Sequence, residues 1–303
     1  MHWSLQWLDD PVWLLEVLFN LQRYLSVKIG GYEMKLTVLV DNNTYIDRYY
    51  LGEPALSFYI EVDDARVLFD AGYSDAFLKN AEKLGVDLNA LTLVVLSHGH
   101  DDHTCGLPAL FGCYDLHKTS LIAHPDCFWP KRSGGLDMGA PYSAEEITAR
   151  TDYQPSVAPV WLTEHLVFLG EIPRTMAFEP SYAMGERLYN GKWESDIVTE
   201  DSALVYRNNE GLFVITGCSH SGICNIIEYA KHICDEERVL GVIGGFHLFA
   251  DDERLAQTVD YLAAQQPKLC YPCHCVSLAA KAKMLERLPV TEVGVGMTVT
   301  IEH

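Results

Sequence analysis

A run of aliphatic residues that ends in a cluster of metal-ligand side chains constrains this chain of 303 residues more than any other stretch. Residues 91–96 predict a buried strand, and His98, His100, Asp102 and His103 follow at once. His98 and His100 are two positions apart, which places them on one face of an extended tip rather than on a helix. His98 and His100 can therefore hold one metal ion, while Asp102 and His103 turn toward a second. Imidazole and carboxylate ligands suit zinc, iron or manganese. The alternative interpretation of this stretch is a solvated, histidine-rich loop.

Two later strands end in side chains of related chemistry. Residues 211–216 form an apolar run that opens into a Gly-Cys-Ser-His turn, where His220 lies two positions beyond Cys218. A thiolate can ligate or bridge a metal ion, and His220 can be a ligand or a proton-transfer group. Residues 239–244 predict a strand that ends in two glycines, which let the backbone approach a ligand closely. We interpret the following His247 as a substrate-binding or acid/base residue, with a structural histidine as the alternative.

The His-x-His-x-Asp-His sequence after a hydrophobic strand resembles the first metal motif of the metallo-β-lactamase superfamily. The Asp70-x-Gly turn resembles an earlier motif of that superfamily, whose carboxylate supports the metal loop. The resemblance implies an αββα sandwich of the α/β (α+β) class, with two mixed sheets face to face, helices outside and a dinuclear metal centre at one edge. A Gly-Glu-Ile-Pro-Arg turn and the motifs around Cys218, His247 and His274 resemble the branch named for 7,8-dihydropterin-6-methyl-4-(β-D-ribofuranosyl)aminobenzene 5′-phosphate synthase.

The resemblance also implies a set of metal ligands. Cys218 stands where common members carry a bridging aspartate, and His274 where they carry the last ligand. The usual His-Thr-x-Gly-His motif is missing, so His220 is the preferred third ligand of the first metal, with Asp196 and Asp201 nearest the expected place of that motif. The expected ligands of two divalent transition metals, zinc before iron or manganese, are His98, His100, Asp102, His103, Cys218, His220 and His274.

Several reactions are compatible with such a centre. Two divalent ions close together can activate a shared water for attack on a carbonyl or phosphoryl centre. We therefore expect a hydrolase of a phosphoester, a lactone or a related small molecule, in which Asp102 orients the nucleophile and His220 or His247 protonates the leaving group. The branch's name implies a transferase that joins a pterin to an aminobenzene ribose phosphate. A metal-containing sensor without turnover is the third hypothesis, because a fold alone does not determine a reaction.

The chain divides into a short N-terminal appendage and one large domain. Residues 1–33 predict an amphipathic helix that could dock, form homo-oligomers, lie on a membrane surface or precede a natural start at Met34. Residues 34–303 predict a single metallo-β-lactamase-type domain. The aromatic stretch at about 126–200, broken by Gly and Pro, predicts an inserted lid. Its cations Lys131 and Arg174 are candidates for contact with an anionic substrate, with solvated surface charge as the alternative.

The composition argues against several classes of function. A formal net charge of −20, from 42 acidic and 22 basic residues, disfavours binding to a nucleic acid backbone. We expect a small anionic or heterocyclic substrate instead, because the metal site supplies its own positive charge. Nine cysteines without disulfide-like spacing predict a reducing, cytoplasmic location. No stretch predicts a membrane span.

Overall fold

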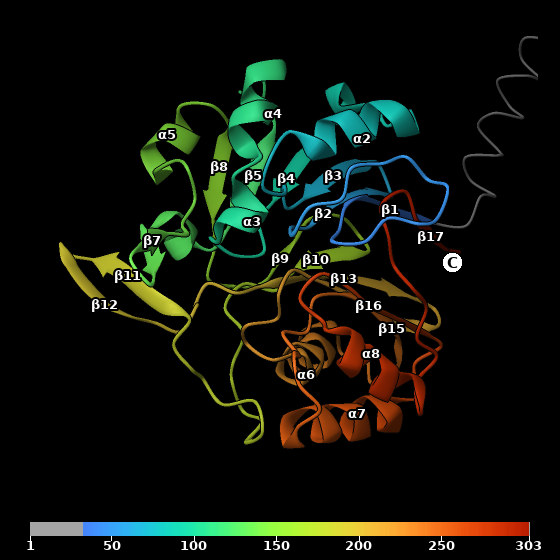
Figure 1. Ribbon diagram of the computed structural model, residues 1–303. Helices are drawn as coiled ribbons and strands as arrows, with labels where there is room; N and C mark the ends of the chain where they lie inside the picture. Colours follow the sequence, from blue (N-terminus) through green and yellow to red (C-terminus); the bar gives the residue numbers. More distant parts are fainter. Residues whose placement is uncertain (1–32, 303) are drawn as a thin grey trace, which may run out of the picture.

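Two β-sheets packed face to face, with helices on both outer sides, make up the body of the protein (Figure 1). The structure, a computed structural model, describes residues 33–302, and the predicted N-terminal helix falls outside the described residues. The two sheets and their helices confirm the predicted αββα arrangement and the mixed α/β class. A third, smaller sheet projects from one end of the sandwich.

The first sheet has seven strands and is covered on its outer side by short helices. In spatial order its strands are β17 (Thr298–Ile301), β1 (Met34–Val40), β2 (Ser57–Val62), β3 (Ala65–Phe69), β4 (Leu93–Val95), β5 (Ser120–Ala123) and β8 (Asp152–Pro155). Its helical segments are α2 (Ala76–Leu84), η1 (Leu88–Ala90), α3 (Asp101–Thr104), α4 (Leu107–Cys113), η2 (Pro125–Phe128) and α5 (Ala144–Thr148). Gly85 ends α2 in the left-handed conformation that glycine adopts without strain.

The second sheet has six strands and carries three helices from the C-terminal part of the chain. In spatial order its strands are β16 (Leu269–Pro272), β15 (Val239–Gly244), β14 (Gly211–Thr216), β13 (Ala203–Asn208), β10 (Leu166–Phe168) and β9 (Val160–Trp161). Helices α6 (Ile223–Cys234), α7 (Glu253–Gln265) and α8 (Leu278–Leu285) pack on its outer face (Figure 1). No helix within residues 33–302 has both the length and the apolar character needed to cross a membrane.

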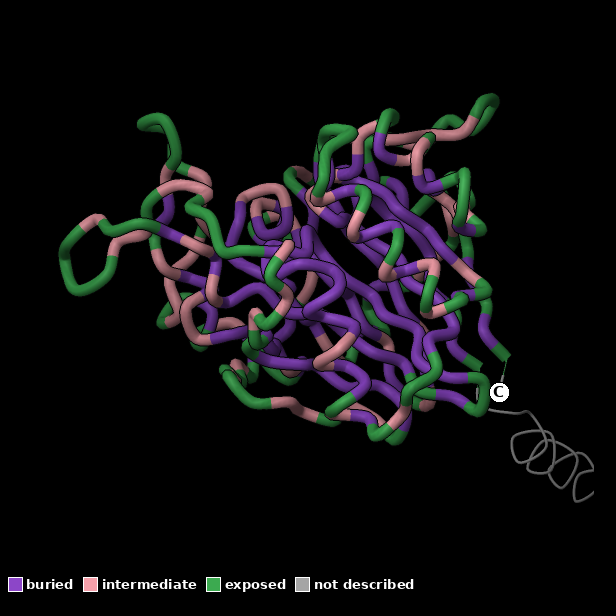
Figure 2. Tube along the Cα trace, turned by 90° about the horizontal axis from the view of Figure 1, so that it is seen from below, coloured by how far each residue is buried: buried purple, intermediate pink, exposed green. Residues whose placement is uncertain are grey.

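Alternation of side chains along the strands builds the hydrophobic layers. On β2, Phe58 and Ile60 face the opposite sheet, whereas Tyr59 faces the helices outside. On β14, Ile215 faces the other sheet and Val214 packs against α6 and its neighbours. Both faces of these strands are therefore buried, which explains why they are continuous apolar runs in the sequence. Figure 2 shows the buried strands through the middle of the molecule and exposed loops at its margin.

Parallel pairing brings the functional loops to one edge of the sandwich. Strand β4 pairs parallel with β3 and β5, and β15 pairs parallel with β14 and β16. The carboxyl ends of parallel strands lie at the same sheet edge, so the loops that leave them are neighbours. The loops after β4, β14 and β16 carry the predicted metal ligands.

The prediction of one inserted lid at about 126–200 requires correction. Strand β8 lies at the edge of the first sheet, and β9 and β10 belong to the second, so this segment crosses from one sheet to the other. Only β6 (Lys131–Ser133), β7 (Leu136–Asp137), β11 (Gly185–Tyr189) and β12 (Lys192–Asp196) form the projecting sheet (Figure 1). The glycines and prolines mark turns between short strands rather than a single loop.

Candidate metal centre

Seven side chains that can ligate metals converge where strand ends of the two sheets meet. Their donor atoms form overlapping groups, and within each group all donor atoms lie within 4.8 Å of one another. The groups are Asp102, His103, Cys218 and His274; His98, Cys218 and His220; and His98, His100 and Asp102. The structure therefore brings together all seven residues that were predicted to be metal ligands.

His98, His100 and His220 form a triangle of imidazole rings. The ring centroids of His98 and His100 are 4.6 Å apart, and His220 lies 4.8 Å from each of them. All three rings are buried. Within residues 33–302, Nε2 of His100 and both ring nitrogens of His220 lack a hydrogen-bond partner. Because buried polar atoms normally have partners, these converging nitrogens fit a bound cation, and three imidazoles are a common ligand set for zinc.

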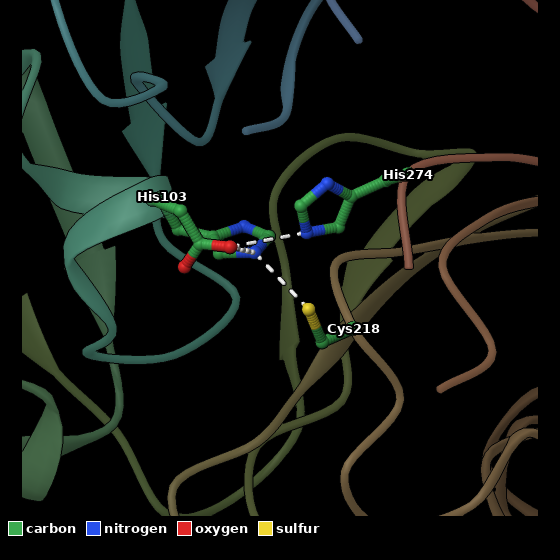
Figure 3. A group of neighbouring side chains, drawn as sticks. His103, Cys218 and His274 are labelled. Carbon is green, nitrogen blue, oxygen red and sulfur yellow. Dashed lines mark hydrogen bonds and ion pairs between the residues drawn. The ribbon is translucent and has the colours of Figure 1, made fainter. Parts of the chain in front are cut away.

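Asp102, His103 and His274 form a second group around the thiol of Cys218 (Figure 3). Nε2 of His103 lies 3.2 Å from Cys218 Sγ, and Nε2 of His274 lies 3.2 Å from Asp102 Oδ2. In Figure 3 the three labelled side chains point toward one another, His103 from helix α3 and Cys218 and His274 from two loops. Imidazole, thiolate and carboxylate together suit zinc or another first-row transition metal.

Cys218 is shared by two of the groups, so its sulfur lies between them. Burial, followed in size by the neighbouring Cys275, raises the pKa of the Cys218 thiol well above its ordinary value. A coordinated metal ion would remove that proton. Gly217 allows the turn to approach the metal loop, because a Cβ atom there would lie 2.1 Å from Oγ of Ser97.

A hydrogen-bond network behind the metal loop orients two of the histidines. Asp70 accepts hydrogen bonds from the backbone N and Oγ of Ser97, both at 2.7 Å, and from Nδ1 of His103 at 2.6 Å. Since the Ser97 hydroxyl donates to Asp70, it accepts from Nδ1 of His98 at 2.9 Å. Both histidines therefore direct an Nδ1–H group away from the cavity, and their Nε2 atoms face the ligand groups.

His274 is oriented in the same way from another loop. Its Nδ1 lies 2.9 Å from Oδ1 of Asn42, and its backbone N donates to Oδ1 of Asp41 at 2.8 Å. His274 and His247 have φ angles of 50° and 52°, in the left-handed region that non-glycine residues rarely occupy. Such strained backbone positions are concentrated at functional sites, where the surrounding structure maintains them.

Replacing Asp70 by asparagine is expected to weaken zinc affinity about 10- to 100-fold, the range typical of groups that orient metal ligands. The new amide nitrogen cannot accept the hydrogen bonds that now come from Ser97 and His103. Affinity can be measured by competition with a chromophoric chelator. The control is Asp75→Asn, which changes an exposed carboxylate that pairs with Lys79 and lies outside the metal-ligand groups. Equal affinities of the Asp70 variant and the wild type would contradict the orienting role.

Burial and neighbouring charges set the ionisation of the ligands. Burial lowers the pKa of His100 to about 4, and burial together with the adjacent His103 holds the pKa of His98 well below its ordinary value. Both imidazoles are therefore neutral at neutral pH, the form in which histidine ligates a metal. Burial opposes ionisation of Asp102, but His103 and His274 outweigh it and hold the pKa of this carboxyl below its usual range.

A cavity of about 470 Å³ opens onto the ligand groups. His100, Asp102, Cys218 and His274 contribute to its lining, as does His247. The remaining lining is largely apolar or aromatic and includes Pro54, Tyr73, Met138, Met184 and Phe249. A cavity with few converging polar groups and apolar walls is typical of a small-molecule site.

Neither cation predicted to contact substrate lines this cavity. Lys131 is 2% exposed, and its Nζ lies 3.1 Å from Asp196 and 2.8 Å from Glu200. Arg174 donates to the backbone carbonyls at 197–198 at 2.7 and 2.8 Å. Lys131 is thus paired with buried carboxylates and Arg174 is hydrogen-bonded to backbone, and the structure places neither of them at the cavity.

Two aspartates near the place of the missing motif do not join the ligand groups. Asp196 binds Lys131, and Asp201 accepts hydrogen bonds from the backbone N and Oγ of Ser221 at 2.8 and 2.7 Å. Burial raises the pKa of Asp201 to about 6. His220, rather than either aspartate, is the residue placed beside His98 and His100.

Sequence reasoning missed three residues close to the centre. Asn42 follows β1 in a polar run, a signal of the same kind as the other strand exits. Tyr182 contacts His247, and Arg254 contacts Tyr182, but neither lies in a recognisable motif. Their positions depend on how distant loops fold over the sheet edge.

The fold and the site together define a protein of the metallo-β-lactamase superfamily. The family described as the Metallo-beta-lactamase superfamily matches residues 51–233, and the chain belongs to it. The predicted family is thereby confirmed, and so is the similarity to the synthase branch.

More particularly, the chain is similar to two proteins of Methanocaldococcus jannaschii. It is 33% identical over 253 residues to the protein MJ0448, covering 82% of this chain and 93% of that protein. It is 30% identical over 272 residues to 7,8-dihydropterin-6-methyl-4-(beta-D-ribofuranosyl)-aminobenzene-5'-phosphate synthase, covering 84% and 91%. The crystal structure of Tm1679, described as a metal-dependent hydrolase of the beta-lactamase superfamily, has a TM-score of 0.76 at 29% identity and covers 89% of this chain and 100% of that one.

Proposed function

We propose that this protein is a metal-dependent hydrolase whose centre holds two divalent ions, zinc before iron or manganese. The observation that carries the proposal is the position of Cys218, whose Sγ lies within 4.8 Å of donor atoms from two groups. His98 and Asp102 are likewise each shared by two groups, and seven donors in three overlapping groups exceed what a single tetrahedral ion binds. When bound, such ions would lower the pKa of a water molecule and neutralise negative charge on the substrate. The description of Tm1679 as a metal-dependent hydrolase supports the same conclusion.

The protein's own residues supply orientation and proton transfer. Asp102 is held ionised and can accept a hydrogen bond from the attacking water, which orients it. His247 lines the cavity without belonging to a ligand group, so it is the better candidate to protonate the leaving group. His220 completes the imidazole triangle, and its nitrogens without protein partners favour a ligand role.

The cavity wall supports a small substrate that combines an anionic or polar centre with a planar or apolar part. Tyr73 and Phe249 are 51% and 57% exposed at the cavity, and both can pack against a ring. We propose a phosphoester, a lactone or a related ester. The net charge of −20 supports a small molecule rather than a nucleic acid. All nine cysteines are free, which supports a reducing compartment such as the cytoplasm.

A second candidate function is transfer rather than hydrolysis. The 30% identity to the dihydropterin ribofuranosylaminobenzene phosphate synthase favours it. In that reaction the same donors would hold the ions against a pyrophosphate leaving group, and water would have to be excluded. A sensor without turnover would retain the ions and the cavity but release no product.

The hydrolase is tested by elemental analysis together with phosphodiester and lactone hydrolysis assays. The wild type is expected to bind about two ions per chain, and His100→Ala is expected to lose at least one of them and to hydrolyse roughly 10³-fold more slowly. His117→Ala is the control, because His117 is exposed on the loop after α4 and belongs to no ligand group.

Three outcomes would redirect the assignment. Absence of bound metal after metal-supplemented purification, or hydrolysis that His100→Ala leaves unchanged, would contradict the hydrolase. Turnover only with a pterin pyrophosphate and an aminobenzene ribose phosphate would favour the transferase. Tight ligand binding without any turnover would favour the sensor.

A further inference from the structure

A hydrogen-bonded chain of three side chains ends at the mouth of the metal cavity. Oη of Tyr182 lies 2.6 Å from Nδ1 of His247, and Nη1 of Arg254 lies 3.3 Å from the same Tyr182 oxygen. The guanidinium of Arg254 also lies 5.5 Å from the centroid of the Tyr182 ring. None of the described metal-ligand groups includes these residues.

The donor chemistry fixes the direction of the hydrogen bond between Arg254 and Tyr182. Arginine has no acceptor, so Arg254 donates to the oxygen of Tyr182. The Tyr182 oxygen can accept from Arg254 and still donate its single proton, so this arrangement allows Tyr182 to donate to Nδ1 of His247. A neutral imidazole that accepts at Nδ1 carries its proton on Nε2. This tautomer is opposite to that of His98 and His103, whose Nδ1 atoms donate.

The position of His247 beside the metal-ligand groups allows this tautomer to act as a proton donor. The ring of His247 is 4.6 Å from the ring of His220 and lines the cavity beside the ligand groups. Its Nδ1 is occupied by Tyr182, and its Nε2 forms no hydrogen bond with residues 33–302. An N–H group is thus held ready as a donor on the substrate side.

We propose that Tyr182 and Arg254 are positioning residues that make His247 the proton donor to the leaving group, an inference that rests on the proposed hydrolase. When the substrate bond breaks, the Nε2–H proton of His247 passes to the leaving oxygen. The Tyr182 hydroxyl proton passes to Nδ1, so the imidazole stays neutral. The resulting phenolate lies against the positive charge of Arg254, and solvent water restores its proton after product leaves.

The test compares two esters that differ only in the leaving group, p-nitrophenol in one and an alkyl alcohol in the other. The p-nitrophenolate ion leaves without a proton, whereas the alkoxide requires one. In the zinc-loaded enzyme, Tyr182→Phe is expected to reduce kcat for the alkyl ester about 100-fold, at the lower end of general acid effects. The p-nitrophenyl ester, the KM values and the zinc content should change little. Tyr189→Phe is the control, since it removes the hydroxyl of another partly exposed tyrosine.

A double variant and an independent readout separate positioning from folding. Once His247→Gln has removed the imidazole, adding Tyr182→Phe should cause no further decrease in kcat for the alkyl ester. ¹⁵N NMR of the His247 ring in zinc-loaded protein should show an accepting Nδ1 and a protonated Nε2 in the wild type, and a tautomer mixture in Tyr182→Phe.

Equal loss of kcat for both esters, or an unchanged His247 tautomer in Tyr182→Phe, would overturn the proposal. If the zinc-loaded wild type hydrolyses neither ester, the proposed hydrolase fails. The role of Tyr182 in proton donation then fails with it, and the NMR result decides only whether Tyr182 holds the tautomer.

Discussion

Replacing Cys218 by alanine is expected to remove most of the bound metal and to lower kcat by roughly 10³-fold or more, beyond the 10- to 100-fold effects of outer-sphere changes. The reason is that one sulfur serves two groups of donors, so its loss weakens both positions at once. His103 Nε2 lies 3.2 Å from this sulfur, and the two residues are 115 positions apart in the chain. Elemental analysis and steady-state hydrolysis measure the two effects.

A matched control separates loss of a ligand from loss of packing. Cys270→Ala removes the same atoms from a buried cysteine that lies in the hydrophobic layer beneath α6, α7 and α8, and it should leave metal content unchanged. Cys218→Asp should recover part of the metal binding, because a carboxylate can occupy the shared position. With cobalt in place of zinc, the thiolate charge-transfer band should vanish in both Cys218 variants. Two ions and full activity in Cys218→Ala would show that the sulfur is not a ligand.

Replacing Lys131 by methionine is expected to lower the free energy of unfolding by about 3–5 kcal/mol, the cost of breaking a buried ion pair from one side. Lys131 is 2% exposed, and its carboxylate partners Asp196 and Glu200 are 2% and 0% exposed. Without the ammonium group, two buried carboxylates would repel each other with no compensating charge. Urea-induced unfolding of the zinc-loaded protein measures the change.

The control for Lys131 is an ion pair of the same type on the surface. Lys79 lies 2.8 Å from Asp75 with both side chains about half exposed, so Lys79→Met should change the free energy of unfolding by less than about 0.5 kcal/mol. Adding Glu200→Gln to Lys131→Met should recover part of the loss, because one buried charge is then removed. Similar unfolding free energies for Lys131→Met and the wild type would contradict the account of a buried charge cluster.

The metal ligands were predictable because their signal is local in the sequence. A buried parallel strand must end at the sheet edge, and the residues directly after it must lie there too. The runs before His98, Cys218 and His274 each mark such an end, so chemistry-bearing side chains after them were expected to meet. The fold class was implied by the resemblance to the metallo-β-lactamase superfamily, and the apolar runs agree with it, since strands buried on both faces need a second sheet and covering helices.

The positions of the cations and of the segment at 126–200 were decided by tertiary structure. Lys131 and Arg174 are cations of the kind that bind anions, but Lys131 is buried against Asp196 and Glu200, and Arg174 is hydrogen-bonded to the carbonyls at 197–198. Whether a charged side chain contacts a substrate or a buried partner depends on how far tertiary packing excludes solvent from it, and a short sequence pattern does not reveal this. Strands β8 and β10 joined the main sheets for a similar reason, because pairing with β5 and β13 is a contact between distant segments.

The sequence by itself determined which residues could ligate a metal at the sheet edge, because strand ends and ligand types are properties of short segments. Only the tertiary structure decided how these residues are combined. It showed that Cys218 is shared between donor groups and that Tyr182 reaches His247 across 65 positions of the chain. Both facts depend on distances of a few ångströms between loops from different sheets. Such distances are set by the packing of the whole sandwich and not by any single stretch of residues.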